Sequence, residues 1–157
     1  MGSKRDADNR NIGHRNNVYP LPITRHILLS THDDRHFASP RRCNNLAYLI
    51  FETAALHDYG LFAFCILPRE VHILCRPGNL QAGHFVGLLK FRYEYVLGKI
   101  GHTKHIWHAE FQEHRLGEGE IIARALNIFE KPVKEGLSES ALAYPFSYVL
   151  GGKNYTP

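Results

Sequence analysis

The sequence predicts an α+β fold, a ferredoxin-like βαββαβα sandwich in which an antiparallel sheet carries helices on one face. Segments rich in β-forming residues alternate with segments whose apolar residues recur at helical spacing. In the middle of the chain, two apolar runs, residues 61–67 and 71–75, are separated only by a tight turn at Pro68-Arg69, which indicates an antiparallel hairpin. Pairing of these middle strands, combined with right-handed crossovers, gives the sandwich.

The first half of the chain supplies one strand and one helix before this hairpin. Residues 23–31 are rich in β-forming side chains and predict the first strand. Ser39-Pro40 has the sequence of a helix N-cap followed by proline at the first helical position. Apolar residues at helical spacing follow, and Gly60 is predicted to end this helix.

The second half of the chain predicts a second helix, a fourth strand and a third helix. The second helix spans roughly 80–99, and residues 106–116 read as a strand, continuous or broken. Glu118 opens the third helix, which Pro132 is expected to end or kink. The remainder, residues 134–157, predicts short turns and an aromatic packing segment.

Length and composition are those of one soluble domain. The 157 residues are 44% hydrophobic and 22% charged, and no apolar stretch reaches the length of a membrane span. We divide the chain into a flexible basic N-terminal arm (1–22), a folded domain (23–150) and a C-terminal tail (151–157). The net charge of +4 permits a nucleic-acid partner through phosphate contacts without demanding one.

The three cysteines predict a cytoplasmic protein. The sequence has an odd number of cysteines, Cys43, Cys65 and Cys75, and no two of them form a CxxC motif. We expect reduced thiols rather than a disulfide framework or a zinc site.

Three segments in register carry a resemblance to a known family. They are residues 64–74, residues 106–114, and residues 132–137 followed by Tyr144-Pro145-Phe146-Ser147. In this order and spacing they resemble the HUH single-tyrosine transposases, in particular the REP-associated branch. The resemblance runs from about Ile23 to Tyr148, so the domain 23–150 is expected to be transposase-like.

The resemblance implies cleavage and rejoining of single-stranded DNA. Two histidines of a His-x-His strand and a third ligand from the last helix hold a divalent metal in this family, and a tyrosine attacks the phosphate. Four positions show what this chain retains. His72 matches the second histidine, Glu70 replaces the first, Asn127 stands at the nucleophile position, and Lys131 stands at the third-ligand position. The resemblance therefore implies a degenerate active site with no intact catalytic set.

The departures from the family pattern have different chemical consequences. Glu70 and His72 can still form a weak two-ligand site for Mg²⁺ or Mn²⁺, because a carboxylate suits a hard cation. Lys131 cannot be a ligand while protonated, but it can contact a phosphate directly. Asn127 cannot act as the nucleophile. In the second segment Trp107, Phe111 and His114 match the family pattern, but His108 stands where the family has a glutamine. The residues expected to bind nucleic acid are Arg69, Lys131, His108, His114 and Arg92.

Three functions remain open at this point. The first is a transposase-like protein that binds single-stranded or hairpin DNA without the tyrosine-dependent cleavage and rejoining of its family. The second is an active metal-dependent single-strand transposase or nickase with a rearranged site. The third is a scaffold repurposed for protein contacts. No membrane partner is expected. A homodimer is compatible with the resemblance, since family members pair in some branches.

Overall fold

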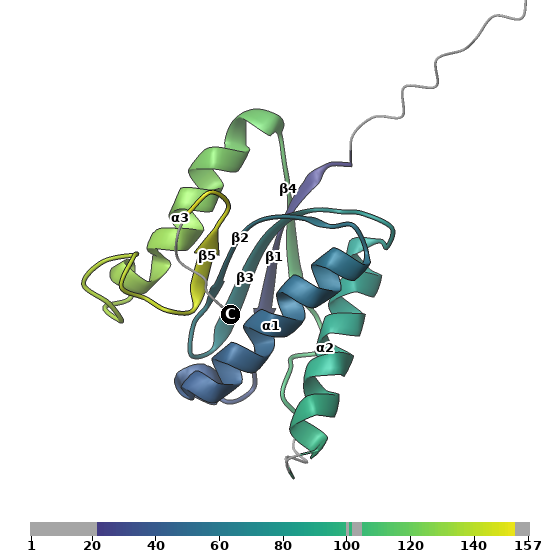
Figure 1. Ribbon diagram of the computed structural model, residues 1–157, viewed down its shortest axis with the longest axis vertical. Helices are drawn as coiled ribbons and strands as arrows, with labels where there is room; N and C mark the ends of the chain where they lie inside the picture. The colour runs from purple at the N-terminus through teal and green to yellow at the C-terminus, as the bar shows by residue number, and fades with distance from the viewer. Residues whose placement is uncertain (1–21, 100, 102–104, 153–157) are drawn as a thin grey trace, which may run out of the picture.

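The protein is described here by a computed structural model, which covers residues 22–99, 101 and 105–152. Its centre is a five-stranded sheet with the order β4-β1-β3-β2-β5, and every neighbouring pair is antiparallel (Figure 1). The ferredoxin-like order of the first four strands and the α+β class are confirmed. The strands are β1 (Thr24–Ser30), β2 (Gly60–Ile66), β3 (Glu70–Arg76), β4 (Gln112–Leu116) and β5 (Ser147–Val149).

Three α-helices complete the fold, and their ends follow local sequence. They are α1 (Pro40–Leu56), α2 (Ala82–Lys99) and α3 (Ile121–Lys134); short 3-10 turns span His36–Ala38 and Glu118–Glu120. The Ser39 side chain caps α1 by accepting a hydrogen bond from the Arg42 N–H, as predicted. However, α1 ends four residues before Gly60, which begins β2 instead.

The helices cover both faces of the sheet, which corrects the prediction that they lie on one face. The larger core cluster packs α1 and α2 against residues such as Ile27 and Ile73, and a second cluster packs α3 against Ala63 and Leu74 (Figure 1). Alternate strand residues point to opposite faces. Because residues 63–67 are all buried, β2 is apolar on both faces and requires cover on both.

The chain after α3 differs from the prediction in two places. Of the two predicted effects of Pro132, an end or a kink, the end is wrong: Pro132 lies inside α3, which continues to Lys134 and stops just before Gly136, whose φ is 72°. Farther on, β5 adds a strand to the edge of the sheet by pairing with β2. Three residues are too few to show the alternation by which a strand is recognised.

The hydroxyl of Tyr144 connects this C-terminal segment to the sheet through a hydrogen bond. It donates a 2.6 Å hydrogen bond to the Ile66 carbonyl, and both residues are buried. We expect Tyr144→Phe to lower the free energy of unfolding by about 1–2 kcal/mol, because one buried acceptor loses a partner. Urea denaturation measures the change. Tyr48→Phe, at an exposed tyrosine on α1, is the matched control, and equal stabilities of the two variants would contradict this role.

The edge of the sheet beside β1 is built in two pieces. Trp107 forms an isolated bridge with Thr31, and the His108 N–H donates to the Ser30 carbonyl at 2.9 Å. Pairing with β1 resumes only at Gln112, so the predicted strand 106–116 is broken. The residues between His108 and Gln112 do not pair with β1. A strand interrupted in this way redirects the side chains of its looped-out residues.

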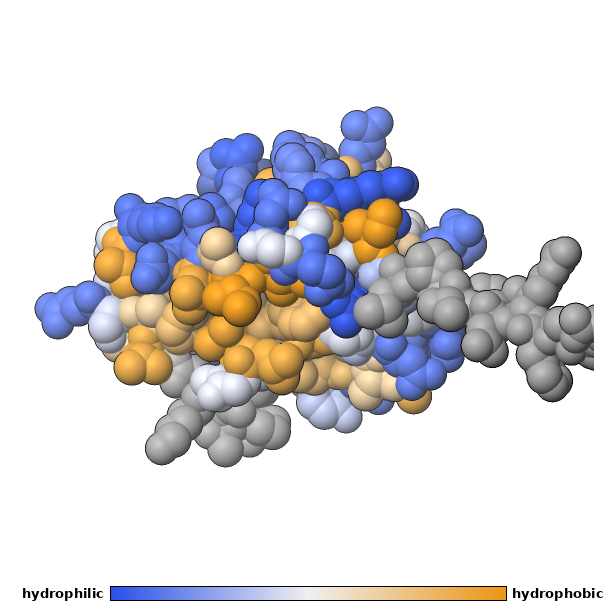
Figure 2. Space-filling view, turned by 90° about the horizontal axis from the view of Figure 1, so that it is seen from above, coloured by the Kyte–Doolittle hydropathy of each residue, from blue (hydrophilic) through white to orange (hydrophobic). Residues whose placement is uncertain are grey.

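The described surface has apolar as well as polar areas. Figure 2 shows apolar side chains in a band across one end of the molecule, bordered along one side by hydrophilic side chains. None of the helices in the described ranges is long and apolar enough to cross a membrane.

All three cysteines are buried free thiols, as predicted, and burial raises the pKa of Cys43 to about 12. The predicted N-terminal arm, apart from Pro22, and the tail beyond Gly152 lie outside the described residues.

Candidate nucleic-acid interface

A row of polar side chains crosses the sheet on the face that α3 covers. On β3 this face carries Glu70 and His72, because these residues alternate with the apolar residues that face α1 and α2. On β1 it carries His26, whose cross-strand partner on β4 is His114. The rings of His26 and His72 lie 5.2 Å apart, and those of His26 and His114 lie 6.0 Å apart. The fold therefore brings together three histidines that are far apart in sequence.

A chain of hydrogen bonds connects α3 to Glu70 through two of these histidines. Arg124 lies 2.8 Å from Nδ1 of His26, Nε2 of His26 lies 3.0 Å from Nδ1 of His72, and Nε2 of His72 lies 3.3 Å from Glu70 Oε2. A guanidinium only donates and a carboxylate only accepts. These two ends assign the tautomers, so that each imidazole accepts at Nδ1 and donates from Nε2. We call these four residues the relay.

The two histidines of the relay are uncharged at neutral pH. Burial, assisted by the neighbouring His72 and Arg124, lowers the pKa of His26 from 6.5 to about 3. Burial and the charge of Lys131 lower the pKa of His72 to about 4. The interior of the relay is therefore neutral, and its formal charges lie at the two ends, on Arg124 and Glu70.

Helix α3 carries two positive charges on the side that faces this row. Arg124 and Lys131 are seven residues apart, about two helical turns, and so lie on the same side of α3. Lys131 is close enough to His26 and His72 to lower the pKa of both. Asn127 lies between these two cations along the helix and is exposed. Of the predicted residues, Glu70 and His72 are thus in direct contact, and the charge of Lys131 acts on His72.

This group of side chains fits a divalent cation poorly. His72 uses both ring nitrogens within the relay, and Arg124 and Lys131 add positive charge beside it. Within the described ranges, no group of three or more His, Cys, Asp and Glu side chains is arranged to hold a metal ion. The arrangement is suited to an anion, which would face two cations.

No tyrosine of the described ranges takes the place of Asn127. Tyr144 is on the same side of the sheet, but its hydroxyl is committed to Ile66 and burial raises its pKa. Tyr59 and Tyr93 are buried in the core on the other side. Tyr48 and Tyr95 are exposed on α1 and α2, and Tyr148 packs against that same core.

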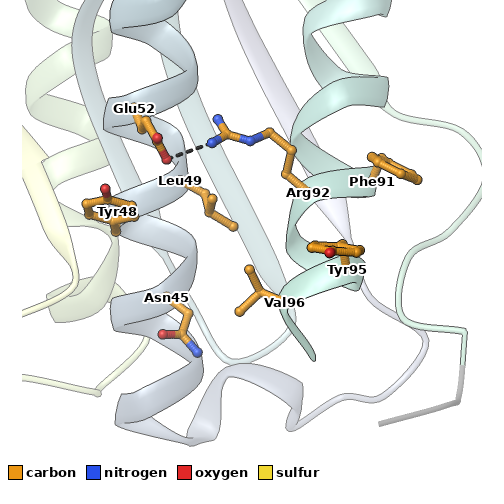
Figure 3. Close-up of a pocket in the computed structure, with 8 residues that line it drawn as sticks. All are labelled: Asn45, Tyr48, Leu49, Glu52, Phe91, Arg92, Tyr95 and Val96. Atoms are coloured by element: carbon orange, nitrogen blue, oxygen red, sulfur yellow. Dashed lines mark hydrogen bonds and ion pairs between the residues drawn. The ribbon is translucent and has the colours of Figure 1, made fainter. Parts of the chain in front are cut away.

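The other residues predicted to bind nucleic acid are divided between two faces. Arg69 and His108 line a pocket that reaches Leu28 and Ser30, beside the relay. Arg92 lies on the opposite side of the sheet, in the groove between α1 and α2, where it forms a 2.7 Å ion pair with Glu52 (Figure 3). The structure thus brings Arg69 and His108 near the polar row and leaves Arg92 apart.

Sequence reasoning missed the two residues at the start of the relay. His26 is a polar residue in an otherwise β-forming strand, and it is buried. It alternates with Ile27, so it lies on the face of β1 opposite to the one that packs against α1 and α2. Arg124 lies seven residues before Lys131, a spacing that places both on one side of a helix. Neither signal identifies a partner, because the contact needs the register of β1 with β3.

Comparison with solved structures shows that this is a transposase-type fold. The REP-associated tyrosine transposase bound to a REP hairpin superimposes with a TM-score of 0.72 and 18% identity, over 99% of this chain and 89% of that one. A presumed transposase from Deinococcus radiodurans R1 gives a TM-score of 0.53 and 15% identity, over 83% and 97%. Neither the protein-family models nor the curated proteins gave a match.

Proposed function

We propose that this chain binds hairpin DNA with a single-stranded flank on the α3 side of the sheet and does not cleave it. The observation that carries this proposal is the pair of cations on one side of α3: Arg124, which lies 2.8 Å from His26, and Lys131, which stands at the position of the third metal ligand in the resemblance. In this proposal the ammonium group of the lysine supplies the positive charge that a metal ion supplies in the family of the resemblance. The similarity in fold to a transposase bound to hairpin DNA supports the choice of partner.

The polar row offers several groups to a backbone phosphate. The Lys131 ammonium can attract a phosphate oxygen as a point charge. The Arg124 guanidinium has five N–H donors, so it can hold His26 and a phosphate oxygen at the same time. His114 is exposed beside His26 on the edge strand and adds a further polar contact. Glu70 stands at the far end of the relay, where its negative charge faces His72.

Tyrosine-dependent strand cleavage, which passes through a covalent intermediate, lacks its nucleophile in this arrangement. A carboxamide at position 127 has no ionisable hydroxyl with which to attack phosphorus and form a covalent ester. The described tyrosines are committed to the core or exposed on α1 and α2. Binding without cleavage is therefore the function that these residues support.

A salt titration tests the binding step. Fluorescence anisotropy with a labelled hairpin that carries a single-stranded flank gives the affinity at several salt concentrations. Suppose that three phosphates are neutralised, by Lys131, Arg124 and one neighbouring basic side chain. The logarithm of the affinity then falls with the logarithm of the salt concentration at a slope of about −2 to −3. The absence of binding at low salt, about 50 mM, would contradict the proposal.

Binding is expected to be independent of divalent metal. In this proposal the cations of α3 supply the positive charge that a bound ion would otherwise provide, so EDTA should leave the hairpin affinity unchanged within about twofold. Mn²⁺ at the same ionic strength serves as the comparison, and Glu70→Gln removes the one carboxylate of the relay. A large EDTA effect that Glu70→Gln abolishes would instead show that Glu70 and His72 hold an ion.

A further inference from the structure

Two histidines lie side by side where the edge of the sheet is interrupted. His32 follows Thr31, the bridge residue just after β1, and His108 follows Trp107, the partner of Thr31 in that bridge. Each of the two histidines donates its backbone N–H to a carbonyl of the opposite segment at 2.9 Å. The fold therefore fixes the backbone positions from which both side chains start.

The register of the bridge places both imidazoles on one face of the sheet. Neighbouring residues of an extended segment point to opposite faces, so His32 and His108 share the face opposite to that of the buried bridge residues. The two histidines are diagonal neighbours across the bridge, a spacing that long side chains can span. Their ring centroids lie 4.2 Å apart, and the ring planes are inclined by 52°. The two rings therefore lean toward each other without stacking face to face.

The ring nitrogens of this pair are free to bind a ligand. Both side chains are exposed, and within the described part of the chain neither ring forms a hydrogen bond. The relay histidines differ in both respects, because His26 and His72 are buried and use both ring nitrogens in hydrogen bonds. The exposed pair thus has lone pairs available, whereas the relay has none to spare.

We propose that His32 and His108 together bind one transition-metal ion such as Zn²⁺, Ni²⁺ or Cu²⁺, at a site separate from the relay. Imidazole nitrogen is a preferred ligand of these ions. Two imidazoles on one tetrahedral zinc ion, with Zn–N distances of about 2.0–2.1 Å, have ring centroids roughly 5 Å apart. A small rotation about the side-chain bonds therefore converts the observed contact into a chelate, and water completes the coordination of the ion.

The charges around the pair are compatible with a cation. Two aspartates follow His32 directly in the sequence, and Glu110 lines a small pocket together with His108. The cation of that pocket, Arg69, is already paired with one of these aspartates, Asp34, at 3.3 Å. No group of three or more potential ligands forms among the described residues. With two protein ligands, the dissociation constant for Zn²⁺ is expected to be on the order of 10–100 µM.

A bound ion joins two segments that are far apart in the sequence. It connects the end of β1 to the residues that precede β4, and it requires the folded chain to bring the two rings together. Binding to the folded state alone stabilises that state by mass action. ZnCl₂ at ten times the dissociation constant is therefore expected to raise the Tm by about 3–5 °C. MgCl₂ at the same concentration should leave the Tm unchanged, because Mg²⁺ prefers oxygen ligands.

Isothermal titration calorimetry of the full chain with ZnCl₂ alone tests the site without DNA. His32→Gln and His108→Gln should each weaken zinc binding at least tenfold and abolish the rise in Tm. The double variant should be little weaker than either single variant, because each substitution breaks the same chelate. Both side chains are exposed, so the variants are expected to fold, and His84→Gln, at an exposed histidine on α2, is the matched control.

Three results would overturn the metal site. The first is zinc affinity that neither histidine substitution changes. The second is a fall in stoichiometry by one ion for each substitution, which would mean that the two rings bind separate ions. The third is zinc binding that Glu70→Gln removes and the two histidine substitutions leave intact, which would place the ion at the relay. The last result alone would also contradict the metal-independent binding proposed above.

Discussion

The Lys131→Ala variant is expected to bind hairpin DNA about tenfold more weakly than the parent protein at 0.1 M salt, with a salt slope smaller by about one. Lys131 lies on the same side of α3 as Arg124, which contacts His26, and its charge lowers the pKa of both relay histidines. Removal of one ammonium loses one phosphate contact and the counterion release that accompanies it. Fluorescence anisotropy over a salt series measures both quantities.

Two further variants separate this local effect from a change in net charge. Lys131→Arg keeps the charge and should retain most of the affinity. Lys99→Ala removes the same charge from the end of α2, on the opposite side of the sheet, and should leave binding nearly unchanged. If Lys99→Ala and Lys131→Ala weaken binding equally, the interface does not lie under α3.

Acidification is expected to destabilise the protein through the two relay histidines. In the unfolded chain they take up protons near pH 6.5, whereas burial in the folded protein holds the pKa of His26 at about 3 and that of His72 at about 4. Between these limits the unfolded state binds more protons, so stability falls as the pH falls. The stabilising contribution is complete above about pH 6.5, and each histidine costs about 1.4 kcal/mol for every pH unit below it.

The pH dependence of urea unfolding measures this effect, and one substitution isolates it. Carboxylates also titrate in acid, so the informative quantity is a difference in slope between two proteins. His26→Gln should reduce the slope by about half a proton at pH 6.5 and by close to one proton at about pH 5. His84→Gln, at an exposed histidine on α2, is the control. Identical slopes for the parent and His26→Gln would contradict a buried, neutral His26.

Local sequence predicted the parts of the fold that depend on neighbouring residues. Ser39 caps α1 as its sequence indicated, and the turn at Pro68-Arg69 joins β2 and β3 in a hairpin. Glu70 and His72, two residues apart on β3, share one side of the sheet. These features follow from spacing along a strand or a helix, which a sequence displays directly.

The parts that escaped prediction depend on contacts between distant segments. The hydrophobic pattern of α3 shows that this helix has a buried side, but it does not show against which face of the sheet the helix packs. That residues 63–67 are all buried shows that both faces of β2 must be covered by helices or loops. The relay contact between His26 and His72 spans 46 residues and requires a specific strand register. β5 is three residues long and is held by pairing with β2 rather than by its own propensity.

A single incubation, analysed on two gels, tests most directly whether this chain holds hairpin DNA without cutting it. The end-labelled hairpin with its single-stranded flank is incubated with the full chain and Mn²⁺, and samples are run on a native gel and on a denaturing gel. We predict a shifted complex on the native gel and only full-length DNA on the denaturing gel. A shortened strand or a protein–DNA species that survives denaturation would contradict the loss of cleavage, and the absence of a shifted complex would contradict the binding.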